Sequence, residues 1–357
     1  MKMKKPSTLY VDADSIIYLS ASAVEDTYIE VEHKETGWKR KFSNVTEFHG
    51  HHLKKEGGWI GKQNAKRGDG NKISSDDFNI THKAKLKKGK RESLKDAMIN
   101  LRSQYTKLRN LGIAEEVVFV IGGGKNYRED LAHTLEYKGN RDKTKRPLLL
   151  KDLRERASLA VEGNILSTWN EEADDFVARK GYESYQEFKK SGWYPYAISY
   201  IDKDLDMTPP CPRLNYNKPE EGVFIPTYEQ TAREYLVQLL EGDKGTDNIQ
   251  GLPSLPEEMF KEYGLRKTKG VGGKTARGVV DFHEDINEAL LAVERAYKGF
   301  YGEEHTFTSW RGEELTWSYL DFMQETSNLI CMSWVEGELF DIREALDKAR
   351  NGKEWWL

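Results

Sequence analysis

Short apolar runs that end in acidic residues recur along this chain. Such runs with β-branched side chains are typical of the buried strands of a parallel sheet. In sheets of this kind, ligands bind beyond the carboxyl ends of the strands. The two clearest runs, with the acids that follow them, are Thr8–Val11 with Asp12 and Asp14, and Tyr196–Ile201 with Asp202, Asp204 and Asp206. We therefore predict that both acidic groups lie at one edge of a central sheet.

Asp202 and Asp204 stand two positions apart, so on an extended segment their carboxylates would point to the same side. Holding two carboxylates close together costs Coulomb energy unless a cation lies between them. Because every candidate ligand is an oxygen, the expected cation is Mg²⁺ or Mn²⁺.

The remaining periodicity predicts the other elements of the fold. Apolar residues at helical spacing run from Leu94 to Leu108, and Gly112 ends that helix. Helices are also expected over 148–160, 229–240, 287–297 and 315–330, strands over 117–121 and 165–168, and a hairpin over 27–42. This alternation predicts the α/β class, with a mainly parallel central sheet flanked by helices.

Charge is balanced overall but unevenly distributed. The 357 residues include 55 Lys or Arg and 59 Asp or Glu. Residues 1–160 hold 33 of the basic and 22 of the acidic residues, and the remainder holds 22 and 37. A metal-dependent enzyme acting on phosphates needs one basic and one acidic region, although asymmetry without function is the alternative.

Composition also excludes several classes of protein. The chain has two cysteines, Cys211 and Cys331, without CxxC spacing, so neither a disulfide framework nor a zinc–thiolate site is indicated. No apolar run resembles a signal peptide or reaches membrane-spanning length, and we expect a soluble intracellular protein. His49, His51 and His52 have no carboxylate or cysteine at a ligand spacing nearby, which favours solvated loop histidines over a metal site.

Two further groups of acidic residues are candidate metal ligands. The sequence NEEADDFVA over 170–178 predicts a helix whose Glu172 and Asp175 share a face, with Asp174 beside them. Capping of the helix is the alternative for any single one of the three. Asp243 and Asp247 come from the glycine-punctuated stretch GDKGTDNIQG.

Basic and glycine-rich stretches are candidate phosphate sites. The stretch EYKGNRDKTKR over 136–146 would place Lys138 and Arg141 on one face of a helical turn, where both could hold a reacting phosphate. GVGGKTA over 270–276 exposes backbone N–H groups at a helix start, as in helix–hairpin–helix grips on DNA. Gly122–Gly124 after a strand is a weaker signal of the same kind.

Taken in order, Asp12, EYKGNRD, EEADD, IDKDLD, GDKGTDNIQG and GVGGKTA resemble the motif series of the flap endonuclease and 5′-nuclease family, and most resemble the bacteriophage 5′-to-3′ exonucleases. The resemblance covers roughly Leu9–Val280, with 43–90 outside it. It implies a 5′-to-3′ exonuclease or flap endonuclease that acts on DNA with 5′ ends or flaps, and on RNA in RNA–DNA hybrids.

The resemblance also implies roles for particular residues. It assigns two Mg²⁺ (or Mn²⁺) ions to Asp12, Glu172, Asp174, Asp175, Asp202, Asp204, Asp243 and Asp247. It places Lys138 and Arg141 on the substrate phosphate. It implies DNA contacts from Tyr137, Lys143, Lys145, Arg146, Gly270, Val271, Gly272, Gly273, Lys274 and Thr275, with a potassium ion at the last six.

The implied organisation has three parts. Residues 1–228 would form the α/β nuclease domain, with a hairpin and basic insertion over 26–92 and an arch or clamp over 137–160. A helix–three-turn–helix DNA-binding region would follow over 229–282, and a helical C-terminal region over 283–357. We expect a monomer without membrane association, working with replication proteins in the cytoplasm of an infected bacterial cell.

Two departures from the family pattern affect this hypothesis. Gly123 falls where the family has an acidic residue, so one expected ligand is missing, and Asp14 is the candidate substitute. An insertion over 252–268 separates GDKGTDN from GVGGKTA. Asp206 has no firm counterpart and is expected to support the ligands.

Two other functions remain open. Asp12-x-Asp14 after a strand, with Asp243 and Asp247, would fit a haloacid-dehalogenase-like phosphatase, which leaves the other motifs unexplained. A DNA-binding protein that has lost catalysis is the second alternative, and Gly123 is the reason for it.

Overall fold

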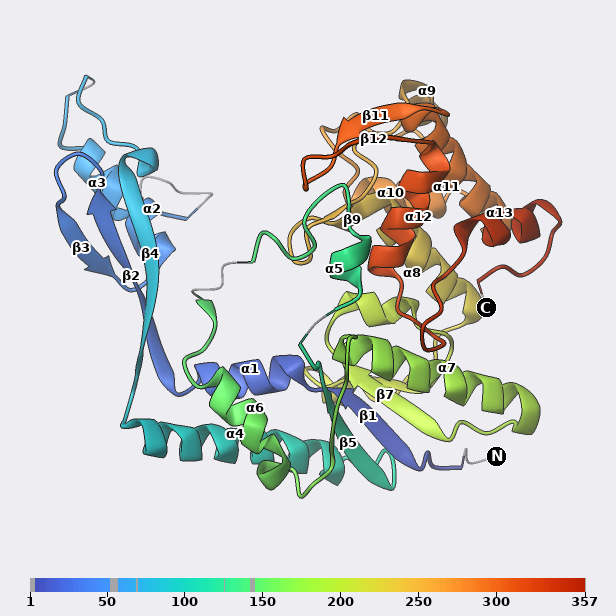
Figure 1. Cartoon of the computed structure of the whole chain (residues 1–357), viewed down its shortest axis with the longest axis horizontal. Helices are drawn as coiled ribbons and strands as arrows, with labels where there is room; N and C mark the ends of the chain where they lie inside the picture. The colour runs from blue at the N-terminus through green and yellow to red at the C-terminus, as the bar shows by residue number, and fades with distance from the viewer. Residues whose placement is uncertain (1–3, 52–56, 69, 125, 142–144, 357) are drawn as a thin grey trace. The chain divides into compact units, whose positions relative to one another are not determined.

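The chain contains a five-stranded sheet, of which Figure 1 labels β1, β5 and β7. The computed structural model describes residues 4–51, 57–68, 70–124, 126–141 and 145–356. In spatial order the strands are β6 (Ile165–Ser167), β5 (Glu116–Ile121), β1 (Thr8–Asp12), β7 (Tyr196–Tyr200) and β8 (Arg213–Asn215). Every neighbouring pair is parallel, which confirms the predicted α/β class with a parallel central sheet.

The register of this sheet explains where its acids lie. Leu9 of β1 is fully buried between Val117 of β5 and Ala197 of β7. Because the strands run parallel, the residues that follow β1, β5 and β7 emerge at one edge. Asp12 ends β1, and Asp202 follows β7 by two positions. The predicted meeting of the two acidic groups at one edge follows from this register.

The chain divides into two compact units, and the expected boundaries at 228/229 and 282/283 stay predictions. Unit 1 comprises 1–14, 105–141 and 164–357, and unit 2 comprises 15–104 and 142–163. The chain passes from one unit to the other within α1 (Asp14–Ser22) and α4 (Lys90–Asn110). We describe each unit by itself.

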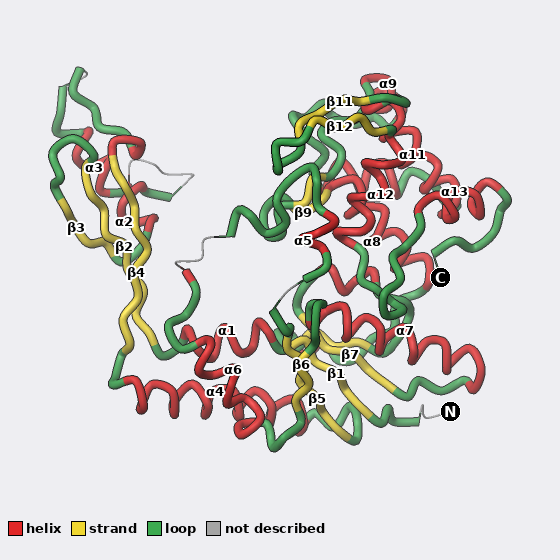
Figure 2. The backbone as a smooth tube through the Cα atoms, viewed as in Figure 1, coloured by secondary structure: helices red, strands yellow, loops and turns green. Residues whose placement is uncertain are grey.

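Unit 1 contains the central sheet and most of the helices (Figure 2). Its helices are α5 (Arg128–Leu131), α7 (Ala173–Ser191), α8 (Tyr228–Glu241), α9 (Glu257–Glu262), α10 (Gly273–Val280), α11 (Ile286–Tyr301), α12 (Tyr319–Ile330) and α13 (Ile342–Arg350). Two small antiparallel pairs complete it: β9 (Gly242–Asp243) with β10 (Ile249–Gln250), and β11 (His305–Thr308) with β12 (Glu314–Trp317).

Helix α7 packs against β7, β1 and β5, so its first turn is held close to the acidic edge of the sheet. The helices from α8 onward share one apolar core, and Tyr137 and Met207 belong to it. Near the chain end Trp356 is fully buried and stacks on Tyr235 with 4.3 Å between ring centroids. The residues after 228 are thus packed into unit 1 rather than standing as separate bodies.

Unit 2 is built on a three-stranded antiparallel sheet of β3 (Lys39–Phe42), β2 (Glu25–His33) and β4 (Phe78–Leu86). Its helices are α2 (Val45–His49), α3 (Trp59–Asn64) and α6 (Leu150–Ala160). The predicted hairpin is confirmed as β2 and β3. Phe42, Phe48 and Phe78 form its buried centre, and Trp59 packs against them. We call the part from Glu25 to Leu86 the inserted sheet domain.

Strand β4 lies in a region for which the sequence analysis predicted no strand. Its inward positions, Phe78, Ile80, His82, Ala84 and Leu86, alternate with exposed polar ones. This period of two was the signal, and the abundance of Lys, Asn and His around it hid the strand.

Within the described ranges, no helix is long and apolar enough to cross a membrane. Cys211 and Cys331 are both buried free thiols.

Candidate metal centre

Asp12 and Asp14 meet at the end of β1. The backbone N–H of Asp14 donates to Asp12 Oδ1 at 3.2 Å. Asp12 is 8% exposed, and burial raises the pKa of its carboxyl to about 7, with further increases from the charges of Asp14, Asp202 and Glu172. An acid that is so easily protonated at neutral pH is a group that a nearby cation would strongly favour in its ionised form.

The end of β5 carries glycine because no side chain fits there. A Cβ at Gly123 would lie 1.7 Å from the carbonyl oxygen of Thr168. A carboxylate at position 123 is therefore excluded without movement of the backbone. The idea that Gly123 is a position from which a ligand has been lost, and to which one could be restored, is wrong for this backbone.

Asp14 lies beside this glycine turn instead. The backbone N–H of Gly122 donates to Asp14 Oδ2 at 3.1 Å, and a Cβ at Gly122 would lie 3.0 Å from the same oxygen. The N–H of Gly123 donates to Thr168 Oγ1 at 3.0 Å. These N–H groups already have protein acceptors, which argues against the phosphate site suggested for Gly122–Gly124. The proximity supports Asp14 as the acidic group at this strand end.

The first turn of α7 brings Glu172, Asp174 and Asp175 together. Glu172 is the residue before the helix, and its backbone N–H donates to Asp175 Oδ2 at 3.2 Å. Burial, followed by repulsion from Glu172 and Asp175, raises the pKa of Asp174 well above its ordinary value. The predicted capping and the predicted grouping of charge thus occur together.

Asp175 has a different environment from Asp174. It is fully buried, and Arg128 binds it through two hydrogen bonds, Nη1 to Oδ2 at 2.6 Å and Nη2 to Oδ1 at 2.8 Å. Tyr127 Oη and the Ser333 N–H also donate to Oδ1. Burial alone would raise the pKa of Asp175, but Arg128 lowers it. With both oxygens so engaged, Asp175 is better suited to fixing the start of α7 than to binding a metal.

The segment after β7 is not extended as predicted. Asp202 caps a 3₁₀ helix, η4 (Lys203–Met207), and its Oδ1 accepts the N–H of Asp204 at 3.3 Å. A short polar side chain that binds the backbone two residues ahead favours such a turn over a strand. The expectation that the two carboxylates project from an extended segment is therefore wrong, although both remain at this edge.

Asp204 is the carboxylate for which the structure gives the strongest reason to expect a cation. It is 7% exposed, and in the described part of the chain no donor reaches its buried Oδ1. Burial raises the pKa of Asp204 to about 8, with contributions from Asp202, Asp247 and Asp243. A buried carboxylate oxygen without a donor is costly, and a cation would satisfy it.

Asp243 ends β9, Asp247 lies in the turn between β9 and β10, and both residues are buried. Asp243 Oδ1 accepts the N–H of Thr246 at 2.9 Å. Asp247 accepts a hydrogen bond from Arg141 Nη2, and its Oδ2 also lies 2.9 Å from the Tyr137 hydroxyl oxygen. Lys138 Nζ lies 3.6 Å from the same carboxylate.

Lys138 and Arg141 reach this acidic group, but not from a helical turn. Lys138 has a positive φ of 57°, and its backbone N–H donates to the Asp247 carbonyl at 2.8 Å. Its Nζ binds Glu172 Oε1, and the Tyr137 hydroxyl donates to Glu172 Oε2 at 2.6 Å. Burial alone would lower the pKa of Lys138, but Glu172 and Asp247 raise it, so the amine is charged. The two predicted basic residues thus bind two of the predicted metal ligands.

Sequence reasoning missed Arg128. It is fully buried, its guanidinium also donates to the carbonyls of Leu329 and Cys331, and it lies 3.8 Å from Glu172 Oε2. Nothing in the sequence marks it, because its partner Asp175 is 47 positions away and no pattern links the two. Asp206, expected to support the ligands, accepts a hydrogen bond from Tyr200 at 2.9 Å.

The other predicted DNA contacts lie elsewhere. Lys145 and Arg146 are exposed residues of unit 2, and Lys143 lies outside the described residues, as does His52. In the stretch 270–275, Gly272 precedes α10 and Lys274 is exposed, whereas Val271 and Thr275 are buried. A Cβ at Gly273 would lie 3.1 Å from Glu241 Oε2. A carboxylate so close is compatible with a cation at this turn, and the DNA and potassium contacts there stay predictions.

The donor set fits hard divalent ions, but the side chains are not preassembled around one. In the described ranges no three His, Cys, Asp or Glu side chains are arranged to hold a metal ion. Lys138 and Arg141 bind Glu172 and Asp247, and the remaining carboxylates repel one another. The fit rests on oxygen donors, on the buried Asp204 Oδ1, and on like charges that a divalent cation would compensate.

No family model and no curated protein matches the chain. Among solved structures, the bacteriophage T5 D15 protein co-crystallised with metal ions aligns at 18% identity and a TM-score of 0.32, over 57% of this chain and 88% of that one. A T5 D15 flap endonuclease complex with DNA and metal ions aligns at 18% identity and 0.33, over 56% and 85%. The chain is thus structurally similar to a phage 5′-nuclease.

Proposed function

We propose that this chain is a divalent-metal-dependent 5′-nuclease. It would act as a 5′-to-3′ exonuclease or flap endonuclease that hydrolyses phosphodiester bonds of DNA, and of RNA in RNA–DNA hybrids. One observation supports this proposal most strongly: carboxylates from β1, the start of α7, η4 and the β9–β10 segment lie close enough to raise one another's pKa values. Lys138 and Arg141 bind two of these carboxylates. The ordered motif series supports the same assignment.

Seven carboxylates are proposed to hold two Mg²⁺ or Mn²⁺ ions, and Asp14 is added to them as the acidic group beside β5. The seven are Asp12, Glu172, Asp174, Asp202, Asp204, Asp243 and Asp247. Asp175, which the resemblance also assigned to the metals, is proposed to act through Arg128 by holding the first turn of α7 in place. Bound divalent ions supply an activated water and stabilise negative charge on a leaving oxygen.

Lys138 and Arg141 are proposed to bind the non-bridging oxygens of the scissile phosphate. Their cationic groups now compensate Glu172 and Asp247, so a phosphate would compete with those carboxylates for the same donors. Cations held by a turn whose backbone is itself hydrogen-bonded are already oriented, and they can stabilise charge that develops in the transition state. The Tyr137 hydroxyl would orient Glu172, to which its proton makes the shorter hydrogen bond, and lies within reach of Asp247.

The direct test is cleavage of a labelled 5′-flap duplex with and without Mg²⁺, beside a phosphomonoester substrate. We expect Mg²⁺-dependent products from the flap and none from the phosphomonoester. Tight duplex binding without cleavage would favour the DNA-binding alternative. Hydrolysis of the phosphomonoester alone would favour the phosphatase.

The setting of this activity is also proposed. The nuclease would act in phage-type DNA replication in a bacterial cytoplasm, and it would be a monomer. Residues 270–275 would grip DNA with the help of a potassium ion. Each of these points needs a test separate from the cleavage assay.

A further inference from the structure

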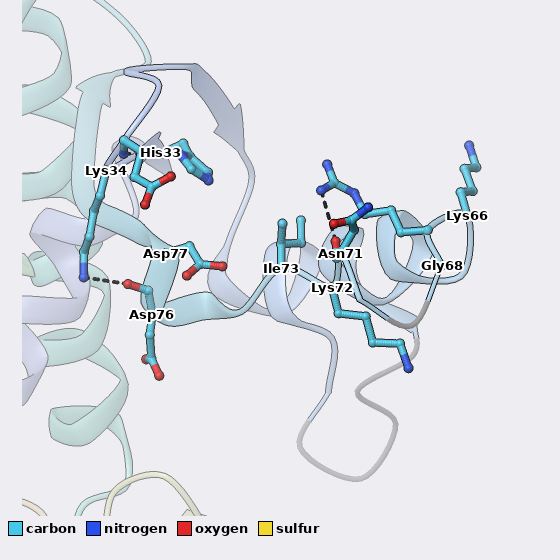
Figure 3. Close-up of a pocket in the computed structure, with 11 residues that line it drawn as sticks. His33, Lys34, Lys66, Gly68, Asn71, Lys72, Ile73, Asp76 and Asp77 are labelled. Carbon is cyan, nitrogen blue, oxygen red and sulfur yellow. Dashed lines mark hydrogen bonds between the residues drawn. The ribbon is translucent and has the colours of Figure 1, made fainter.

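Described residues of unit 2 line two surface hollows, and several groups in the first hollow bind each other. Figure 3 shows this hollow, which has a volume of about 690 Å³. Lys34 Nζ donates to the Asp76 carbonyl at 2.6 Å, and Arg67 Nη1 donates to the Asn71 carbonyl at 3.3 Å. The Asp77 carboxylate accepts a backbone N–H at 2.6 Å. Its lining contains cations and three carboxylates, Glu35, Asp76 and Asp77, so this hollow serves below as the comparison.

The second hollow, of about 420 Å³, is basic and partly aromatic. It collects residues from α1, β2, the segment after β3, β4 and the stretch before α6, all within unit 2. The residues that characterise it are Tyr18, Tyr28, His82, Lys83, Lys145 and Arg146. We call it the basic hollow.

The wall that contains Lys145 and Arg146 is fixed by hydrogen bonds. The Tyr18 hydroxyl donates to the Lys145 carbonyl at 2.9 Å, and the N–H of Leu148 donates to Glu25 Oε2 at 2.8 Å. These contacts tie the stretch before α6 to α1 and β2. Lys145 and Arg146, which the sequence predicted to contact DNA, thus line the same hollow as residues of β4, the strand that the sequence analysis did not predict.

The charges in the basic hollow are unbalanced. Lys83, Lys145 and Arg146 are exposed cations, and Glu25 is the one carboxylate among the described lining residues. Glu25 is 6% exposed, and one of its oxygens accepts the Leu148 N–H, so it opposes a bound anion weakly. An excess of cations over carboxylates among the residues that line a concave surface attracts a polyanion.

Aromatic rings lie beside these cations. Tyr28 lines the hollow, and Lys41 Nζ lies 5.0 Å from the centre of its ring. Tyr18 is 39% exposed. Single strands of nucleic acid bind where cations track the phosphates and aromatic rings stack on unpaired bases. A base inside a duplex is not available to such a ring, and a hollow of this volume suits a group of nucleotide size.

We propose that the basic hollow binds one strand of single-stranded nucleic acid, with a phosphodiester on Lys83 and Arg146 and a base against Tyr28 or Tyr18. The inference rests on the proposed nuclease function, since the single-stranded part of the same substrate would occupy the hollow. It adds Tyr28 and Lys83 of the inserted sheet domain to the nucleic-acid contacts predicted for Lys145 and Arg146. Residues 43–86 of that domain lie outside the region that resembles the nuclease family.

The test compares Lys83→Glu with Lys66→Glu, a matched charge reversal in the other hollow of the same domain. Binding of a labelled oligothymidylate and of a duplex of equal length is measured by fluorescence anisotropy without Mg²⁺, over a range of salt. We expect Lys83→Glu to weaken single-strand binding about tenfold and to lower the salt slope by about one. Lys66→Glu should change the dissociation constant by less than about twofold.

Equal losses in the two variants would mean diffuse attraction and would overturn the proposal, as would wild-type affinity in Lys83→Glu. A duplex that bound more tightly than the single strand, with the same dependence on Lys83, would overturn the choice of ligand. Circular dichroism checks the fold, and Arg146→Glu, which lies off the sheet, carries the same expectation if Lys83→Glu does not fold.

Binding without Mg²⁺ separates this inference from the proposed activity. If the wild-type protein binds the strand through Lys83 but never cuts a flap, the proposed nuclease function is wrong and the proposed binding site in the basic hollow stands. A protein that cuts flaps while Lys83→Glu binds the strand normally would do the reverse.

Discussion

The acidic centre of unit 1, by which we mean the carboxylates proposed to bind metal, and the basic hollow of unit 2 both contain charges of one sign. They differ in how deeply these charges are buried. Asp12 and Asp204 are 8% and 7% exposed, whereas Lys83, Lys145 and Arg146 are exposed to solvent. Water and salt screen the repulsion between exposed charges. Repulsion between buried carboxylates is screened less, and it raises their pKa values. The basic hollow can therefore stand open, whereas the acidic centre requires compensation.

Unit 1 compensates its acids in two ways without a metal. Arg128, Lys138 and Arg141 place cations on Asp175, Glu172 and Asp247. At Asp12, Asp174 and Asp204 the pKa is raised, so protons take the place of cations. Divalent ions would replace the protons of the second set, and the following changes test that division from the largest expected effect to the smallest.

The largest effect should come from neutralising a ligand. Asp174→Asn or Asp202→Asn removes a charge at nearly constant volume, so we expect cleavage of a 5′-flap substrate to fall by roughly a hundredfold to a thousandfold. Single-turnover cleavage measures the rate, and anisotropy checks that duplex binding is retained. Turnover near that of the wild type in both variants would remove these residues from the metal centre.

Removing a buried cation should mainly cost stability. Arg128→Met leaves Asp175 as an uncompensated buried charge, so the free energy of unfolding should fall by about 3–5 kcal/mol. The matched control is Arg277→Met, which breaks the Arg277–Glu234 pair on the surface and should cost at most about 1 kcal/mol. Urea unfolding measures both, and similar losses in the two variants would contradict the distinction between buried and exposed charge.

Adding a methyl group at the end of β5 should also destabilise the protein. In Gly123→Ala the new Cβ would overlap the Thr168 carbonyl, so we expect a loss of about 3 kcal/mol. Gly270→Ala is the control, because a Cβ there has its nearest neighbour at 3.7 Å. Thermal unfolding compares them, and a stable Gly123→Ala protein would reopen position 123 to a carboxylate.

The pH dependence of the metal-free protein tests the same division by a separate route. Asp12 and Asp204 have pKa values raised from 3.8 to about 7 and about 8, so the folded state binds protons that the unfolded state releases. Their contribution to stability is complete below about pH 4 and is lost as the pH rises to about 8.

We therefore expect the metal-free free energy of unfolding to fall by several kcal/mol between pH 5 and pH 8, because each acid contributes about 1.4 kcal/mol per pH unit between its unfolded and folded pKa. The slope should be smaller in Asp204→Asn and with saturating Mg²⁺. Urea unfolding across this range provides the measurement. A metal-free stability that rose with pH would contradict the assignment of protons to these two acids.

The strands and helices of the sheet could be predicted because each depends on its own residues. Apolar runs located β1, β5 and β7, and their parallel order brought Asp12 and Asp202 to one edge. Strand β4 was missed because its polar face matches the composition of a loop.

The details of the site could not be predicted because they depend on distant contacts. Lys138 takes its positive φ where its N–H meets the Asp247 carbonyl, and Asp202 turns the chain through its own side chain. Arg128 finds Asp175 across 47 positions. Sequence spacing identifies acids that can act together, whereas tertiary structure decides which of them are already paired.

The most direct test of the account is the number of divalent ions that the acidic centre binds. Electron paramagnetic resonance titration with Mn²⁺ at pH 8 counts bound ions in the wild type, in Asp204→Asn, and in Asp206→Asn as a control of equal charge change. Asp206 already accepts a hydrogen bond from Tyr200, so its variant should bind as the wild type does. We predict two ions in the wild type and in Asp206→Asn, with one lost or weakened at least about tenfold in Asp204→Asn. A wild type that binds no Mn²⁺, or an Asp204→Asn protein that binds it unchanged, would contradict the central claim that these buried carboxylates form a metal centre.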